Sequence, residues 1–211
     1  MTEPIVHQYV TSAWTLNFSY VAMCPETRKG FVVDPTGESD IILKAIKSLR
    51  AQILYLINTH THPDHVEAIS AVKEATGAAA MCHSGGLYPE YFDEIWEGEQ
   101  KTLKVGNLEV KMIHTPGHSK DSVCILCGEA LFTGDTLFIG YVGRTDLPGS
   151  SSREMFKSLS KIRELPDNLI VYPGHNYGEA PFRLLGEEKQ LSPFLRARTF
   201  EELGYLLGSQ E

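Results

Sequence analysis

Apolar residues follow two different spacings in the first half of the chain, and each spacing predicts its own kind of element. Short, mostly apolar runs bounded by turn residues predict strands over residues 14–23, 30–35, 53–59 and 78–83. Apolar residues at positions 41, 42, 43, 46 and 49 have a helical spacing, which predicts a helix over 40–50 that Ser39 or Asp40 caps. A second helix is expected over 66–77, because Gly77 is a typical residue to end one.

The second half of the chain repeats this alternation of strands and helices. Strands that end in turn residues are predicted over residues 108–118, 122–128, 130–135 and 168–175. A helix is predicted over 151–165, where Ser151 and Glu154 have the spacing of a capping box, and a short final helix over 200–208. Two central sheets with helices outside would bury these strands on both faces, so we expect an α/β fold. We expect a single domain over 1–211, with a short helical tail at about 186–211.

Composition narrows the class of protein. The chain has 211 residues, 42% of them hydrophobic and 22% charged, which is ordinary for a soluble globular enzyme. Its net charge of -8 argues against binding to nucleic-acid phosphates or to an anionic membrane, because either partner needs a basic patch. The start, "MTEPIVHQYV", resembles no signal peptide, and no apolar run approaches the length of a transmembrane helix, so a cytoplasmic location is expected.

The four cysteines form no disulfide-dense framework, which also fits a reducing cytoplasm. Cys124 and Cys127 make a C-x-x-C motif, which invites a redox or zinc interpretation. They lie in a strand-like run, however, and residues three apart on a strand point to opposite faces. We therefore interpret them as small buried hydrophobic residues and not as shared metal ligands.

The stretch "NTHTHPDH", residues 58–65, follows a buried strand and concentrates metal-binding side chains. His60 and His62 alternate with Thr61, so in an extended loop the two histidines face the same way. A proline then ends the strand, and Asp64 and His65 open the next helix. This density of histidine and carboxylate side chains predicts a metal site.

Three further strand ends supply the remaining ligands. "TPGH" ends at His118, "FTGD" at Asp135 and "YPGH" at His175. Each is preceded by glycine, which permits a sharp turn and close backbone approach. Single histidines or aspartates in turns are commonly structural, but together these side chains exceed the four ligands of one tetrahedral zinc. His7, His83 and His114 fit none of these turns and are expected to be surface or structural histidines.

Seven ligands suit two metals that share a carboxylate. We expect His60, His62 and His118 on one metal, Asp64, His65 and His175 on the other, and Asp135 as the bridge. A metal-bridged hydroxide would be the nucleophile, because coordination lowers the pKa of water to about 7. The second metal would polarise a substrate carbonyl and stabilise the oxyanion. Asp64 and Asp135 are the expected catalytic carboxylates.

In the order and spacing of "THTHPDH", "TPGH", "TGD" and "PGH", the chain resembles the metallo-β-lactamase superfamily over nearly its whole length. This resemblance implies a four-layer αββα sandwich with two divalent metals at one edge of its sheets, most often zinc, with iron or a zinc–iron pair as alternatives. Within the superfamily, "LFTGDTLFIGYVGRTDLPGSS" is similar to the glyoxalase II branch, hydroxyacylglutathione hydrolases. The implied reaction is hydrolysis of a thioester such as S-D-lactoylglutathione.

Two departures from glyoxalase II leave an alternative open. The chain ends 36 residues after His175, too soon for the helical extension that binds glutathione in the full-length enzymes. The segment "GRTD", residues 143–146, is similar to the persulfide dioxygenases, in which the equivalents of His60, His118 and Asp135 hold one iron. The alternative function is therefore a mononuclear iron dioxygenase acting on glutathione persulfide.

Three residues are candidates for substrate binding. Arg144 either binds a substrate carboxylate or pairs with Asp146 to fix the loop, and we favour the structural role. Tyr141 and Tyr177 flank the metal-bearing turns, where they either line the pocket or simply pack.

Other members of the superfamily suggest further activities and partners. A lactonase or a nuclease is less well supported, because an RNA-processing enzyme needs a basic groove. A non-catalytic metal scaffold ranks last, since turns at the edge of a fold suggest an open site. We expect a small-molecule thioester or thiol-derived substrate, no nucleic acid or membrane partner, and a monomer or homodimer.

Overall fold

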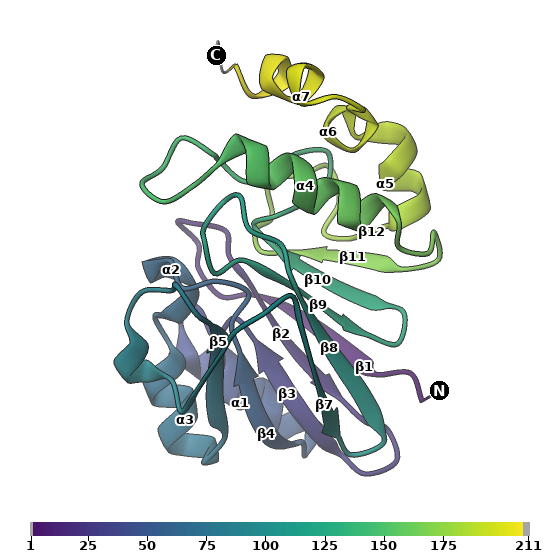
Figure 1. The fold of residues 1–211 in the computed structure, drawn as a ribbon. Coiled ribbons are helices and arrows are strands. Elements are labelled where there is room, and N and C mark those ends of the chain that lie inside the picture. Colours follow the sequence, from purple (N-terminus) through teal and green to yellow (C-terminus); the bar gives the residue numbers. More distant parts are fainter. Residues whose placement is uncertain (1, 209–211) are drawn as a thin grey trace.

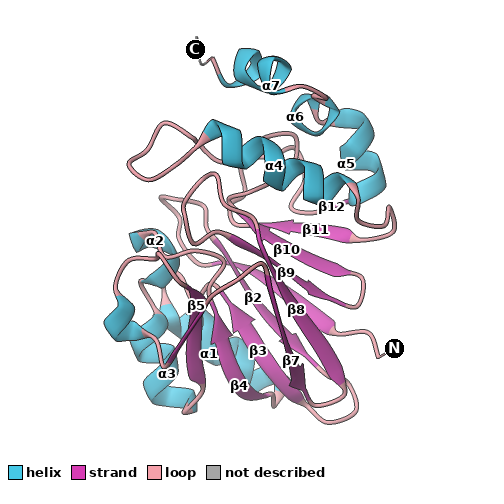
Figure 2. Ribbon diagram, viewed as in Figure 1, coloured by secondary structure: helices cyan, strands magenta, loops and turns pink. Residues whose placement is uncertain are grey.

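The computed structural model describes residues 2–208 and contains two six-stranded sheets that pack face to face (Figures 1 and 2). The first sheet has the order β1 (Ile5–Val10), β2 (Phe18–Met23), β3 (Lys29–Val33), β4 (Gln52–Ile57), β5 (Ala79–His83) and β6 (Glu94–Trp96). The second has the order β12 (Arg183–Leu184), β11 (Ile170–Pro173), β10 (Ala130–Gly134), β9 (Val123–Cys127), β8 (Leu108–His114) and β7 (Gln100–Val105).

Helices cover both outer faces of this sandwich (Figure 2). On the first sheet lie α1 (Ser39–Leu49), α2 (Pro63–Val66) and α3 (Ile69–Thr76), and a 3-10 turn, η1 (Pro89–Tyr91), follows β5. On the second sheet lie α4 (Ser152–Arg163), α5 (Leu185–Leu191), α6 (Pro193–Arg196) and α7 (Phe200–Leu207). None of the helices in residues 2–208 is long and apolar enough to span a membrane.

Three apolar layers hold the four layers of structure together. Between the sheets, Tyr20 and Phe31 meet Phe132 in edge-to-face contacts. Outside the first sheet, Ile42 and Val72 pack on the strands, and outside the second sheet α4 contributes Leu159 and its neighbours. All six residues of β2 are buried, as expected for a strand covered on both faces. The predicted αββα sandwich is thereby confirmed.

The site lies where strands of like direction end. Strands β3, β4 and β5 are parallel to one another, and β10 is parallel to β11. Strand β8 also runs in the direction of β10, because both pair with β9 in antiparallel fashion. The carboxyl ends of β4, β8, β10 and β11 all lead into ligand-type residues. Turns of this kind on a rigid sheet fix side-chain geometry well.

Most predicted elements are confirmed, but three details were wrong. Neither Ser39 nor Asp40 caps α1, because Glu38 is the N-cap residue and no side chain bonds the helix start. The strand predicted over 14–23 is β2, which begins at Phe18 and not at residue 14, since residues 13–15 form a turn. The helix predicted over 66–77 is split into α2 and α3, because Ala68 leaves helical geometry with ψ near 0°.

The sequence pattern also missed four strands. β1, β6, β7 and β12 lie at or near the edges of the two sheets. β7, with the sequence "QKTLKV", alternates exposed and half-buried side chains up to the buried Val105, so it contains no apolar run. β12 has only two residues and is defined by pairing to β11. Their partners, not their own residues, specify these strands.

Candidate metal centre

The first group of site residues follows β4 directly. His60 is fully buried and His62 half-buried, in the extended segment between β4 and α2. Pro63 occupies the first turn of α2, where its missing N–H costs no hydrogen bond, so Asp64 and His65 begin the helix. The side chain of Asn58 donates to the carbonyl of His65 (2.7 Å) and ties the start of this helix back to the strand end.

The second group comes from the other sheet, and glycine allows it to approach. Asp135 directly follows β10, and a Cβ on Gly134 would lie 2.6 Å from the Cβ of Thr59 on the opposite sheet. His175 follows β11, and a Cβ on Gly174 would lie 3.0 Å from Cε1 of His65. Real Cβ atoms essentially never show the first distance, and the second is tighter than nine in ten real Cβ contacts, so glycine at these turns lets the two strand ends meet.

Three histidines converge in the first ligand set. Nδ1 of His62 lies 3.1 Å from Nε2 of His60 and 2.9 Å from Nε2 of His118. Nitrogens that share a tetrahedral zinc at 2.0–2.1 Å are about 3.3 Å apart, so these separations are close to those of a metal site. The three ligand atoms can hold one metal ion.

The second set is built around His65 and His175. Their Nε2 atoms lie 3.2 Å apart, and Oδ2 of Asp64 lies 3.4 Å from Nε2 of His175 and 3.8 Å from Nε2 of His65. These three residues can also hold one metal ion. The structure brings together the residues predicted for each set, and it also brings ligand atoms of His60, His65 and Asp135 close to one another.

Asp135 lies between the two sets. Its Oδ2 is 3.5 Å from Nε2 of His118 and 3.4 Å from Nε2 of His175, and its Oδ1 is 3.4 Å from Nε2 of His65. Oδ1 is buried and has no hydrogen-bond partner among the described residues. A buried carboxylate oxygen is rarely left unsatisfied, so this atom fits a role as a metal ligand. The imidazole and carboxylate donors of the whole cluster suit zinc or iron.

The opposite ring nitrogens of these histidines are bonded to the fold. Nδ1 of His65 lies 3.0 Å from the buried carboxylate of Asp34, and Nδ1 of His175 lies 2.7 Å from the carbonyl oxygen of Thr15. Nδ1 of His118 lies 2.9 Å from the carbonyl oxygen of Arg144. When Nδ1 donates to such an acceptor, Nε2 presents its lone pair to the centre, as metal ligation requires.

The sequence interpretation missed these outer residues. Asp34 follows β3 at the same edge, so an aspartate at a strand end was a usable signal, and it also accepts from N and Oγ1 of Thr59 (2.7 and 2.6 Å). Asn17 was missed as well, although its Nδ2 donates to Oδ2 of Asp64 (3.1 Å). The carbonyls of Thr15 and Arg144 carry no sequence signal, because every residue has one.

The electrostatics of the cluster favour a bound cation. Burial and the positive charge of His65 lower the pKa of His60 well below its usual value, so His60 is neutral at pH 7, the form that binds metal. Burial lowers the pKa of His65, but the carboxylates of Asp135 and Asp34 outweigh it and raise that pKa well above its usual value. Burial would raise the pKa of Asp135, yet the charge of His65 and the contact with His175 hold it far below. Asp135 is therefore negative at any pH near neutrality.

The predicted substrate-binding residues take different positions. Tyr177 stacks on the ring of His175, with centroids 4.6 Å apart and an interplanar angle of 11°. Tyr141 is more than half exposed and shares with Tyr177 the lining of a pocket of about 510 Å³. Arg144 forms a two-pronged pair with Asp146 (2.8 and 2.9 Å), as the structural interpretation expects. Both side chains of this pair are about 68–69% exposed, and binding of substrate by Arg144 stays a prediction.

The residues expected to be structural lie outside the cluster. His83 contacts the carbonyls of Ser84 and Gly98 (2.9 and 3.1 Å) and stacks on His114. Cys124 and Cys127 pack in different apolar layers, on opposite faces of β9. Burial raises the pKa of the Cys124 thiol to about 11 and that of Cys127 to about 12. Neither thiol is reactive at neutral pH, in agreement with their interpretation as buried hydrophobic residues.

Comparison with known proteins gives consistent results. The family model described as "Metallo-beta-lactamase superfamily" matches residues 16–175. The chain is 32% identical over 183 residues to the probable polyketide biosynthesis zinc-dependent hydrolase PksB of Bacillus subtilis, across 85% of this chain and 80% of PksB. It is 33% identical over 186 residues to a hydroxyacylglutathione hydrolase of Polaromonas sp., across 85% of this chain and 69% of that protein. The crystal structure of ETHE1 from Myxococcus xanthus superposes with a TM-score of 0.88 at 29% identity, and covers 97% of this chain and 90% of that one.

Proposed function

This chain belongs to the metallo-beta-lactamase superfamily, and from that premise we propose that it is a metal-dependent hydrolase that cleaves a thioester. The observation that carries the proposal is the double ligand set with Asp135 between its halves. Similarity to a hydroxyacylglutathione hydrolase and to a zinc-dependent hydrolase supports hydrolysis as the reaction and a thioester as the bond that is cleaved.

The distances between ligand atoms divide the proposed metal ligands into two sets. His60, His62 and His118 would hold one ion, and Asp64, His65 and His175 the other, with Asp135 shared. Bound metal of this kind supplies an acidified water as nucleophile and a Lewis acid for the substrate carbonyl. Zinc is the metal that we propose first, because PksB, a relative of this chain, is named as zinc-dependent.

The residues of the chain then position and protonate the reacting groups. Asp34 and the carbonyls of Thr15 and Arg144 fix the histidine rings. Burial and the negative charges of Asp135 and Asp64 raise the pKa of Tyr177, so its hydroxyl stays protonated at neutral pH. We propose that this hydroxyl donates a hydrogen bond to the substrate, beside the second ligand set.

Thioester hydrolysis by matched variants tests this proposal. The purified protein is loaded with zinc and assayed with S-D-lactoylglutathione and with an acyl thioester of N-acetylcysteamine. We expect His62→Ala to lower turnover by about 100-fold or more, because it removes a proposed metal ligand that no other side chain replaces. His7→Ala, a half-buried histidine of β1 far from the ligand sets in sequence, is the control and should retain full turnover. Hydrolysis of neither thioester by the zinc-loaded protein contradicts the proposal.

A second candidate function has its own support. The overlap with ETHE1 covers nearly the whole chain, and the segment 143–146, "GRTD", is similar to the persulfide dioxygenases. His60, His118 and Asp135 would supply the two-histidine, one-carboxylate set that oxygen-activating iron uses. Metal content separates the candidates: about two metals per chain favours the hydrolase, whereas one iron per chain with oxygen uptake on glutathione persulfide favours the dioxygenase.

A further inference from the structure

A pocket adjoins the second ligand set. It has a volume of about 510 Å³, and its lining includes Ile139, Tyr141, Tyr177, Glu179, Arg183 and Leu191. Because Tyr177 both lines the pocket and stacks on His175, the pocket opens beside the proposed metal centre. A substrate whose reacting bond lies at the centre can therefore extend one arm into it.

Arg183 is the single cation among the described residues that line this pocket. Its Nη1 is 3.0 Å from Oε2 of Glu188, a residue that is fully buried. Oε1 of Glu188 accepts a hydrogen bond from the backbone N–H of Gly140 (2.6 Å), which belongs to the pocket wall. One side of the guanidinium is thus fixed to the fold, and its position in the pocket is set in advance.

The other side of the guanidinium is held weakly. Nη2 of Arg183 is 3.4 Å from Oε2 of Glu179, whose side chain is 91% exposed. An exposed pair at this distance contributes little free energy. A carboxylate that arrives in the pocket can therefore take the place of Glu179, and two parallel N–H···O bonds to arginine are a favoured geometry for it.

An exposed leucine lies near the first ligand set. Leu87 is 50% exposed, and its backbone N–H donates to Oγ1 of Thr61, the residue between His60 and His62. A substrate that spans both ligand sets would meet an apolar side chain beside the first set, and tyrosines and an arginine beside the second. A polar, charged arm fits the Tyr177 side of the centre better than an apolar acyl chain does.

We propose that this pocket binds the thiol arm of the substrate, and that Arg183 is a specificity residue that pairs with a carboxylate on that arm. The assignment rests on the proposed thioesterase function. It specifies the substrate class as acyl thioesters of carboxylate-bearing thiols. Glu179 competes for the same nitrogen of Arg183, so it limits affinity for such substrates.

Three small thioesters separate the possible arrangements. S-acetyl-3-mercaptopropionate carries a carboxylate on the thiol arm, S-acetyl-N-acetylcysteamine is neutral, and S-succinyl-N-acetylcysteamine carries the carboxylate on the acyl arm. For the zinc-loaded protein we expect the lowest KM with the first. Arg183→Gln should raise that KM about tenfold with little change in kcat, and leave the KM of the neutral thioester unchanged. Glu179→Gln should lower the KM of the first thioester, and Arg28→Gln, at the turn between β2 and β3, should change nothing.

A binding measurement gives a readout that does not depend on turnover. The thioether S-methyl-3-mercaptopropionate cannot be hydrolysed, and its Kd is measured by calorimetry for the wild type, Arg183→Gln and Glu179→Gln. We expect about tenfold weaker binding by the first variant and tighter binding by the second. Equal KM values for all three thioesters, a preference for the succinyl compound, or weaker binding by Glu179→Gln would each overturn the assignment. Absence of any hydrolysis, with the expected order of Kd values, would overturn the proposed function and leave the carboxylate site standing.

Discussion

At the scale of single residues, the hydrogen bonds behind the ligands decide which ring nitrogen faces the centre. Asp34 accepts from Nδ1 of His65 and from both donors of Thr59. When the ring of His65 is neutral, this contact keeps the proton on Nδ1 and leaves Nε2 free to bind metal. We therefore expect Asp34 to contribute to metal affinity without being a ligand.

Asp34→Asn tests this role with a side chain of the same shape. The amide nitrogen would face Nδ1 of His65 and donate to it, so the ring proton would move to Nε2 and block ligation there. We expect the affinity for zinc to fall about 10–100-fold, measured by competition with a chromophoric chelator. Asp40→Asn, an exposed aspartate of α1, is the control and should keep wild-type affinity. Unchanged affinity in Asp34→Asn would show that the tautomer of His65 is set by another group.

The sequence predicts the ligand residues better than it predicts the groups that hydrogen-bond to them. A dense group of histidine and aspartate side chains at strand ends is rare enough to be found by inspection, and the structure brings all seven of them together. Asp34 has a recognisable signal that was not used, because a lone aspartate after a strand is also an ordinary turn residue. The carbonyl of Arg144 has none, since its contact with His118 depends on how the loop over 136–146 folds back.

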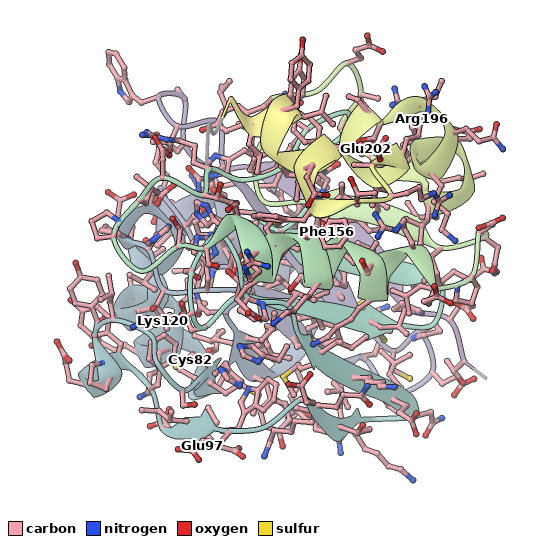
Figure 3. All side chains as sticks on the ribbon, turned by 45° about the horizontal axis from the view of Figure 1, so that its top comes forward. Cys82, Glu97, Lys120, Phe156, Arg196 and Glu202 are labelled. Atoms are coloured by element: carbon pink, nitrogen blue, oxygen red, sulfur yellow. The ribbon has the colours of Figure 1, made fainter. Side chains whose placement is uncertain are left out.

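At the scale of elements, α4 connects the second sheet to the ligand turn of His118. Oγ of Ser151 accepts from the N–H of Glu154 (3.2 Å), and the N–H of Ser151 donates to the carbonyl of Gly117 (2.8 Å). Farther along the helix, the ring of Phe156 faces α7 and meets Phe200, with centroids 6.3 Å apart (Figure 3). The start of α4 is therefore fixed both by its cap and by the turn that carries a ligand.

Loss of this cap should destabilise the protein. We expect Ser151→Ala to lower the free energy of unfolding by about 1 kcal/mol, because the N–H of Glu154 loses its acceptor. Ser152→Ala, at the next position of the same helix, is the matched control, since the side chain of Ser152 makes no hydrogen bond among the described residues and alanine is the better helix former. Urea unfolding at constant zinc concentration measures both. Equal midpoints for the two variants would contradict the assigned cap.

Contacts of Asp93 with α3 and β5 predict that the stability of the protein depends on pH. Asp93 accepts from Nζ of Lys73 on α3 (2.7 Å) and from the N–H of Ala80 on β5 (2.9 Å), and these bonds lower the pKa of its carboxyl below the model-peptide range. A lowered folded-state pKa means that the stabilisation is present above the unfolded pKa of about 3.9 and is lost as the pH falls through the folded value.

The size of the Asp93 contribution is modest, because the carboxyl is about half exposed. We expect Asp93→Asn to be less stable than the wild type by about 0.5 kcal/mol above pH 5, with the difference shrinking below pH 4. Urea midpoints from pH 3 to pH 7 measure the difference. A difference that stays constant down to pH 3 would show that the charge of Asp93 does not contribute.

Whether an element can be predicted depends on where its stability comes from. Strands β2, β4 and β10 are buried on both faces, so their own apolar residues predict them from the sequence. β7 and β12 form because a neighbouring strand offers hydrogen bonds, and their sequences give no comparable signal. The split between α2 and α3 serves the ligands, because α2 ends after presenting Asp64 and His65.

At the scale of the whole molecule, the metal centre joins the two halves of the sandwich. The first half of the chain provides His60, His62, Asp64 and His65, and the second provides His118, Asp135 and His175. Each ligand set includes residues from both halves. Bound metal therefore links the edges of the two sheets, and its free energy of binding adds to the stability of the whole fold.

Removal of metal should for this reason destabilise the entire molecule and not only the site. At a free zinc concentration of 100 times Kd, one site adds about 2.7 kcal/mol, equivalent to about 5–10 °C in the Tm of a chain of this size. Calorimetry of the chelator-treated and zinc-loaded protein measures this shift, and two occupied sites should roughly double it. Asp135→Asn should lose a large part of the shift, because its neutral amide cannot bridge two cations, whereas Asp146→Asn, far more exposed, should keep it. A Tm that does not respond to zinc would mean that the two ligand sets do not bind that metal across the sheets.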